Sequence, residues 1–413
     1  MPRAPTLDGQ YVKLGPRTFS PSRRMSRAVH FSAVCALVFA LFFIVQSCYA
    51  QISDSTSITA FDQTVDEAMT QSGVPGLAIA LIERGQVIWT KGYGLADKEA
   101  GISVTPSTLF QAASVSKSLS AWAVMRLVEQ GKLALDTPVS HYLTRWKLPD
   151  TGYGSNAVTL RRILSHTAGL SVPGYLGFGP GQALQSIEAS LASADDTGHQ
   201  GVRVIYPPGA SFYYSGGGYT VIQLIIEEAT HSDFAQWVQR NVLEPLEMQH
   251  SSFVPPAAHA ASYDAYGARV PDRRFTALAA AGLYSSAADL GKFVAALLNG
   301  PHGEAIGRGV LATQTVRDVL MPQPSSESSE ILVLSEWGLG YGLKFLPESK
   351  HTLVYHPGDN IPGFHNFIAA IPSARTGLVV LANGAQGRQL RMTVLCTWLR
   401  MHNEGTLQEC RGR

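Results

Sequence analysis

The sequence predicts an α/β fold of the α+β kind, in which one sheet is built from both ends of the chain. Short runs of β-forming residues separated by turns occur early in the globular part and again near the C-terminus. Between them the hydrophobic spacing is helical and is broken by loops rich in glycine and proline. Strands at both ends therefore favour one discontinuous sheet with a helical insertion, and a site in the cleft between the two parts.

A pair of strands opens this fold. Leu77 to Glu83 is almost wholly apolar, Arg84-Gly85 predicts a turn, and Gln86 to Tyr93 continues with β-forming residues. After a polar link, apolar residues at helical spacing predict a helix from about Ser114 to Gln130, ended by Gly131.

The middle of the chain, from about Val158 to Leu298, is mostly helical in pattern. Its helices are predicted at Tyr219 to Ala229, Phe234 to Val242 and Ala287 to Leu298. The stretch from Ser171 to Gly181 holds four glycines and two prolines, so we expect a loop that forms one wall of a pocket.

Strand character returns near the C-terminus, and a last helix is predicted from about Gln389 to His402. The four late strands are predicted at Tyr341 to Leu346, Thr352 to His356, Asn366 to Ile371 and Gly377 to Asn383. One domain over residues 51–413 is therefore expected. Its sheet part would cover about 51–107 and 325–413, and its helical part about 108–324.

Composition narrows the class of protein. The 413 residues are 45% hydrophobic and 15% charged, which suits one large core or two modest ones. The formal net charge of +1 gives no basic surface for a nucleic acid, so no such partner is expected. Metal-ligand spacings such as CxxC and HExxH do not occur, so we expect neither a metal nor another cofactor.

Residues 1–50 predict an export signal or a membrane anchor. A basic segment, Arg23 to Arg27, precedes a mostly apolar run from Ala28 to Val45. Translation from Met25 would give an ordinary signal peptide that ends at Ala50. An uncleaved anchor and acylation at Cys48 are the two alternatives, the first because the run is near the length that spans a bilayer. All three place the body of the protein in the periplasm or outside the cell.

Two cysteines, Cys396 and Cys410, lie outside this segment. In an oxidising compartment they would form one disulfide near the C-terminus. Two separate thiols are the alternative.

Ser114 and Lys117 are the first candidate catalytic residues. A serine hydroxyl needs a base within hydrogen-bonding reach to act as a nucleophile. Residues three apart on a helix share a face, so local geometry alone brings this hydroxyl and this amine together. The same pair also fits an ordinary solvent-exposed helix start, so the catalytic interpretation depends on support from further clusters.

Three further clusters stand out in the sequence. Tyr214 lies beside three consecutive glycines, Gly216 to Gly218, where a tyrosine can approach a substrate closely and, with a lowered pKa, act as a base. His356-Pro357-Gly358 leaves a predicted strand, whose edge can offer a backbone N–H to an oxyanion. His166 is better explained by a helix end, with Gly169 as its cap and the imidazole bonded to backbone, than by a Ser-His-Asp triad.

Together these clusters resemble the serine beta-lactamase and penicillin-binding-protein superfamily. The resemblance is to its class C-like branch, which includes D-Ala-D-Ala carboxypeptidases and family VIII esterases. The family's Ser-x-x-Lys falls on Ser114 to Lys117, its Tyr-x-Asn on Tyr214 to Gly216, and its Lys-Thr-Gly or His-x-Gly on His356 to Gly358. Supporting segments are Val74 to Gly76, Leu164 to Leu170, Ala281 to Asp289 and Trp337 to Gly342, and the resemblance covers about Ile58 to Gly384.

The resemblance implies a mainly antiparallel sheet with flanking helices and an acyl-transfer mechanism. Ser114 would form the acyl-enzyme, and Lys117 and Tyr214 would share the proton transfers. Backbone N–H groups of Ser114 and of Asp359, which follows Gly358, would form the oxyanion hole.

Two departures from the family pattern bear on the substrate. Gly216 replaces an asparagine that touches the lysine and the substrate, and His356 replaces a lysine that helps to hold a substrate carboxylate. A neutral imidazole binds an anion less strongly than an ammonium does. We therefore expect an exported serine hydrolase for esters or small peptides and amides, with a small-molecule or peptidoglycan-like substrate. A beta-lactamase proper and a non-catalytic sensor or scaffold are the alternatives.

Overall fold

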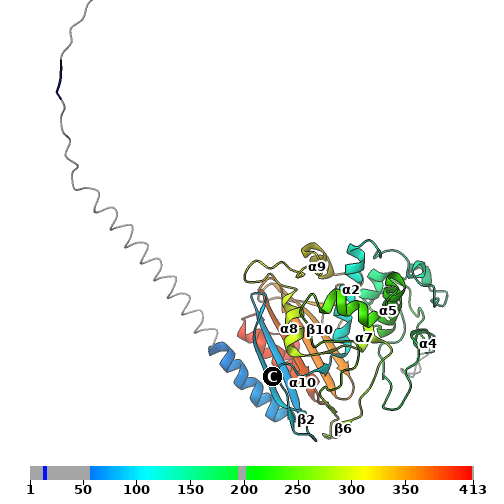
Figure 1. The fold of residues 1–413 in the computed structure, drawn as a ribbon, viewed down its shortest axis with the longest axis horizontal. Coiled ribbons are helices and arrows are strands. Elements are labelled where there is room, and N and C mark those ends of the chain that lie inside the picture. Colours follow the sequence, from blue (N-terminus) through cyan, green and yellow to red (C-terminus); the bar gives the residue numbers. More distant parts are fainter. Residues whose placement is uncertain (1–12, 16–55, 194–200, 412–413) are drawn as a thin grey trace, which may run out of the picture. The chain divides into compact units, whose positions relative to one another are not determined.

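An eight-stranded antiparallel sheet forms the centre of the fold (Figure 1). Its strand order is β3-β2-β1-β12-β11-β10-β9-β8, so strands from the two ends of the chain meet where β1 pairs with β12. The strands are β1 (Gly76–Glu83), β2 (Gln86–Asp97), β3 (Ile102–Ser103), β8 (Glu336–Trp337), β9 (Gly342–Leu346), β10 (His351–Asn360), β11 (Phe364–Ile371) and β12 (Thr376–Ala382). The predicted fold class and its antiparallel sheet are confirmed.

The structure is a computed structural model that describes residues 13–15, 56–193 and 201–411. The predicted export segment therefore lies outside the described residues, apart from residues 13–15. Among those described, no helix has the length and apolar character needed to cross a membrane. From Phe61 onward the chain forms one compact unit.

Both faces of the sheet are buried. On β1, Ala78, Ala80 and Ile82 point into the large core that also holds the apolar residues of α8 (Ala287–Ala295). The alternate residues of β1 are equally buried but face the other way, as the period of two in a strand requires. On that side α10 (Gly387–Met401) packs on β11 and β12 (Figure 1). A strand buried on both faces has an almost unbroken apolar run, as β1 does.

The central helix differs from its prediction at its first turn. Ala113–Val115 forms a 3-10 turn, η1, and the α-helix α2 then runs over Ser116–Glu129. Gly131 has a positive φ of 69°, which fits its predicted role after the helix end. Ser114 therefore lies in a tight turn just before the helix.

Other helices follow the prediction with shifted ends. The predicted helix from Phe234 to Val242 divides into α6 (Phe234–Val238) and a π-helical turn, η4 (Gln239–Leu243). α5 (Gly216–Thr230) also covers a predicted helix, whereas no helix range was predicted for the short helices α3 (Leu160–Leu164), α4 (Ile187–Ala192), α7 (Leu278–Ala281) and α9 (Thr313–Val319). Two small strand pairs, β4 (Phe110–Gln111) with β7 (Tyr284–Ser285) and β5 (Ser262–Tyr263) with β6 (Arg269–Val270), complete this region.

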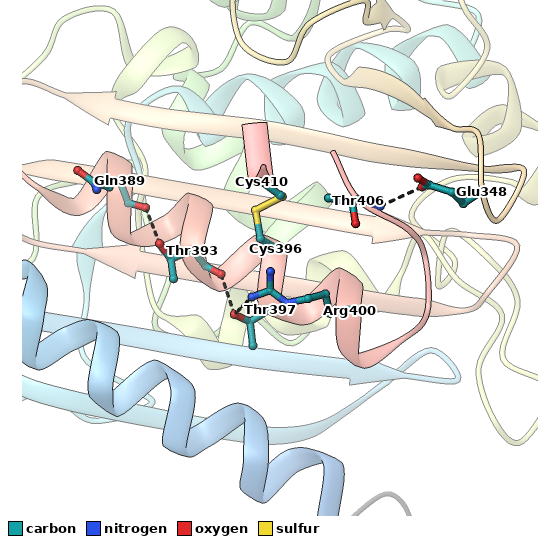
Figure 2. Close-up of a disulfide and its surroundings, with 8 residues drawn as sticks. All are labelled: Glu348, Gln389, Thr393, Cys396, Thr397, Arg400, Thr406 and Cys410. Atoms are coloured by element: carbon teal, nitrogen blue, oxygen red, sulfur yellow. Dashed lines mark hydrogen bonds between the residues drawn. A yellow bond between two sulfur atoms is a disulfide. The ribbon is translucent and has the colours of Figure 1, made fainter. Parts of the chain in front are cut away.

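A disulfide joins Cys396 in α10 to Cys410 in η5 (Gln408–Cys410), as Figure 2 shows. The expected pairing is therefore confirmed over the alternative of two separate thiols.

Candidate active site

The turn that carries Ser114 is fixed by its neighbours. Ala113 has a positive φ of 52°, and Ser114 is part-exposed between fully buried residues. β10 lies directly against this turn, because a Cβ on Gly358 would come within 2.2 Å of the Ala112 carbonyl oxygen. Only glycine permits that approach, which brings the backbone at Asp359 beside the candidate nucleophile.

Lys117 is positioned as the base for Ser114. Its Nζ lies 3.0 Å from Ser114 Oγ and donates a hydrogen bond of 2.7 Å to the carbonyl of Ala280. The side chain is buried, and removal from water lowers the pKa of Lys117 to about 7. A substantial neutral fraction at pH 7 can therefore accept the serine proton.

Tyr214 completes this group. Its hydroxyl is hydrogen-bonded to Ser114, and Lys117 Nζ lies 5.1 Å from the centre of its ring. Burial raises the pKa of Tyr214 well above its ordinary value, although the bond to Ser114 opposes that shift. The phenol therefore stays protonated in this state, so Lys117 is a better candidate for the base than a tyrosine phenolate.

Tyr214 is held by the start of α5. The Ser215 side chain caps this helix by accepting the N–H of Gly218 at 3.0 Å, and it donates to the Ser171 carbonyl at 2.7 Å. The Ser215 N–H donates to His166 Nδ1 at 3.1 Å. These three bonds fix the residue that follows Tyr214.

His166 supports Tyr214 and is not part of a triad. Its ring stacks on the Tyr214 ring with centroids 4.2 Å apart, and burial holds the pKa of His166 well below its ordinary value. The imidazole does bond backbone, as expected. The predicted cap was wrong, however, because α3 ends at Leu164 with Ser165 as its C-cap, and His166 takes the left-handed conformation that closes a Schellman motif.

His356 lies beneath the site. Its side chain is fully buried, and Nδ1 is 2.6 Å from the carbonyl oxygen of Pro357. Burial, together with the charge of Lys117, lowers the pKa of His356 to about 3, so the ring is neutral. The edge of Trp337 meets the ring at a centroid distance of 5.4 Å. The structure thus places His356 near Tyr214 but behind the pocket surface.

Gly216 marks where the family's asparagine would be. A Cβ on this residue would lie 3.2 Å from the Pro173 carbonyl oxygen and 3.3 Å from Cε2 of Tyr175. Residues 171–181 form the predicted loop, and its carbonyls accept the N–H groups of Gly216 and Gly217. The loop thus fills the space beside Gly216 with the ring of Tyr175.

Asp359 contributes more than the predicted backbone N–H. Its carboxylate accepts hydrogen bonds from Arg391 and His365, both at 2.6 Å, and from Arg388 at 3.2 Å. Burial works to raise the pKa of Asp359, but the bond to His365 and the charge of Arg391 hold it well below its usual range. This ion cluster anchors the strand edge beside Ser114 to α10.

A pocket of about 740 Å³ contains Ser114, Tyr214 and Asp359. Its walls come from several separate parts of the chain, which include Pro173 and Gly174, Glu330 and Ile331, Glu409, and the face of α10 that carries Arg388 and Arg391. His356 and Gly216 are described by the structure but are not among the lining residues.

Several of these residues had no role in the predicted site. Trp337 contacts the rings of both His166 and His356, and it lies in a segment already noted for its resemblance to the family. Arg388 and Arg391 are three positions apart at the start of the last helix, a spacing that suggests one shared face. Tyr175 had no sequence signal beyond its place in a glycine-rich loop.

Two curated proteins are similar to this chain in sequence. Protein flp of Staphylococcus aureus (strain NCTC 8325 / PS 47) is 24% identical over 333 residues, which cover 78% of this chain and 62% of that protein. Esterase EstB of Burkholderia gladioli is 33% identical over 217 residues, covering 49% of this chain and 53% of the esterase. This chain thus spans less than two thirds of the length of either curated relative.

The fold has solved counterparts. The octameric penicillin-binding protein homologue from Pyrococcus abyssi superposes with a TM-score of 0.71 and 26% identity, covering 86% of this chain and 79% of that one. Residues 61–393, most of the chain, match the family described as Beta-lactamase. That match covers most of the chain and shows that the chain belongs to the Beta-lactamase family.

Proposed function

We propose that this chain is a serine hydrolase that forms an acyl-enzyme on Ser114 and cleaves esters or small amides. The observation that carries the proposal is the 3.0 Å contact between Lys117 Nζ and Ser114 Oγ, made by an amine whose pKa is about 7. A permanently charged lysine could not take the serine proton. Burial of Lys117 therefore supports catalysis at neutral pH.

The proposed reaction proceeds in two balanced halves. Lys117 takes the proton of Ser114 as Oγ bonds to the substrate carbonyl carbon, and the N–H groups of Ser114 and Asp359 stabilise the oxyanion. The bond to the leaving group then breaks, and the leaving oxygen or nitrogen receives that proton through the hydroxyl of Tyr214. Lys117 then takes a proton from water as the water oxygen bonds to the acyl carbon, and the bond from that carbon to Ser114 Oγ breaks as Oγ takes the proton back.

Two features support a preference for esters and small amides over β-lactams. The amide that would contact a lactam side chain is absent at Gly216, where the Tyr175 ring lies instead. His356 is neutral and buried, so it offers no cation to a substrate carboxylate. The similarity to Esterase EstB points the same way, although it covers only 49% of this chain.

A substrate panel tests this proposal. Wild type and Ser114→Ala would be compared on p-nitrophenyl acetate and butyrate, nitrocefin and a D-Ala-D-Ala peptide. We expect hydrolysis of the esters by wild type alone, with slow or no nitrocefin turnover. Rapid nitrocefin turnover would identify a beta-lactamase proper. Equally slow ester hydrolysis by both proteins would contradict the proposal and favour the non-catalytic sensor or scaffold.

We also propose that the protein is exported and acts on a small-molecule or peptidoglycan-like substrate outside the cytoplasm. The disulfide between Cys396 and Cys410 supports export, because such bonds persist in oxidising compartments. N-terminal sequencing of the mature protein would test it. A first residue at or near Gln51 is expected from signal cleavage, and an intact N-terminus in the membrane fraction would indicate an anchor.

A further inference from the structure

The C-terminal segment returns to the active-site pocket. Glu409, close to the end of the described chain, lines the same pocket as Ser114 and Tyr214. Glu330 and Ile331 line the same pocket. A C-terminal residue outside every family motif thus lines the same pocket as the candidate nucleophile.

Glu409 holds the loop that carries these two wall residues. The Val333 N–H donates a hydrogen bond of 2.6 Å to Glu409 Oε1, and the ammonium of Lys344 donates to the Val333 carbonyl. The base of this loop is closed by two backbone bonds between Ser328 and Ser335, of 2.7 and 2.8 Å. The loop is therefore fixed at its base and at Val333, two residues from Ile331.

The disulfide fixes Glu409 in turn. Cys410 follows Glu409 directly and is bonded to Cys396, one helical turn beyond Met392, which also lines the pocket. Figure 2 shows the segment beside α10, with the Thr406 N–H donating to Glu348 at 2.9 Å. One covalent link thus joins the α10 wall of the pocket to the segment that holds the loop wall.

We propose that Glu409 is a positioning residue for the hydrolase reaction, locked in place by the disulfide, and that it sets substrate affinity by holding the loop of residues 328–335. This inference rests on the proposed function. Glu409 lies in the pocket wall and accepts the Val333 N–H, so we expect it to act on the shape of the pocket and not on the chemical step. A loop that is already held in its binding position loses less conformational entropy when a substrate binds, so the substrate binds more tightly.

Kinetics of Glu409→Ala and Glu409→Gln test the proposal with p-nitrophenyl butyrate. Glutamine keeps an oxygen that can accept the Val333 N–H, whereas alanine does not. We expect the alanine variant to raise KM by roughly tenfold, in line with loss of a hydrogen bond to a charged group, with kcat within about twofold of wild type. The glutamine variant should return KM to within about threefold of wild type.

Two further measurements separate positioning from plain stability. The double variant Cys396→Ser/Cys410→Ser should also raise KM. Mild reductant should raise the KM of wild type but not the KM of the double variant. The matched control is Glu348→Ala, which loses a contact to the same segment outside the pocket and should leave KM unchanged.

The proposal is overturned if Glu409→Ala lowers thermal stability but leaves KM alone, or if Glu348→Ala raises KM equally. It is also overturned if Glu409→Gln is as defective as Glu409→Ala. Failure of the proposed function would be seen separately, as ester hydrolysis that does not depend on Ser114 in the wild-type background.

Discussion

At the scale of single residues, Lys117 determines how activity should depend on pH. Its pKa is lowered to about 7 by burial, and the neutral amine is the active form. Activity should therefore be lost as pH falls through 7, by about tenfold per unit below it. The measurement is kcat/KM for p-nitrophenyl acetate from pH 5 to 9, corrected for spontaneous hydrolysis.

His356 provides the control for this profile. With a pKa of about 3 it stays neutral over the whole range, so His356→Asn should leave the midpoint near 7. A midpoint near 10, the ordinary range for lysine, would contradict the assignment of Lys117 as the base.

Gly216 should resist restoration of the family's asparagine. The new Cβ would meet the Pro173 carbonyl and the Tyr175 ring at 3.2 and 3.3 Å, and the amide beyond it needs further space. We expect Gly216→Asn to lower the free energy of unfolding in urea by about 1–3 kcal/mol, the usual cost of overpacking.

Removing the Tyr175 ring tests whether that ring is what excludes an asparagine at position 216. Tyr175→Ala combined with Gly216→Asn should cost less than the sum of the two single changes, because the asparagine then has room. Strict additivity of the two changes would show that Tyr175 is not what excludes the asparagine.

At the scale of elements, the N-terminus of α5 links stability to catalysis. Ser215→Ala leaves the Ser171 carbonyl and the Gly218 N–H without their partner, both in a buried setting. We expect a loss of about 1–3 kcal/mol in urea unfolding and a fall in kcat for p-nitrophenyl butyrate, since Tyr214 precedes this cap.

The cap of α4 offers a matched comparison. Ser186 caps that helix in the same way, by accepting the Ala189 N–H at 3.2 Å, but it is exposed. Ser186→Ala should cost less than Ser215→Ala and leave kcat unchanged. Equal effects on kcat would contradict the role given to the α5 cap.

Element boundaries show where sequence patterns fail. β10 was predicted to end at His356, yet it continues to Asn360 because its pairing with β11 extends to Phe364. α5 begins at Gly216, three residues before the predicted start at Tyr219, because Ser215 caps it and the loop carbonyls satisfy its first N–H groups. The extension of β10 and the loop contacts of α5 depend on partners distant in sequence, whereas the Ser215 cap is a local signal that the prediction missed.

At the scale of the whole molecule, the disulfide should contribute measurably to stability. It closes a loop with a sequence separation of 14, for which chain entropy predicts about 3 kcal/mol. Denaturant unfolding of wild type with and without reductant should differ by about this amount. Cys396→Ser/Cys410→Ser should be insensitive to reductant, and an unchanged wild-type midpoint would show that the link constrains little.

The sequence by itself determined the local pair and the overall pattern. Ser114 and Lys117 meet because they are three residues apart across the start of one helix, and strands at both ends of the chain make one sheet. Local spacing and hydrophobic period carry that information over short distances.

Only the tertiary structure decided what surrounds the pair. Burial lowers the pKa of Lys117 to about 7 and keeps His356 away from the pocket surface, and neither burial follows from local spacing. Contacts between distant segments place the Tyr175 ring beside Gly216 and place Glu409 in a wall of the pocket. Desolvation and packing depend on the whole fold, so the sequence identified the reacting groups while the fold shaped the pocket in which they react.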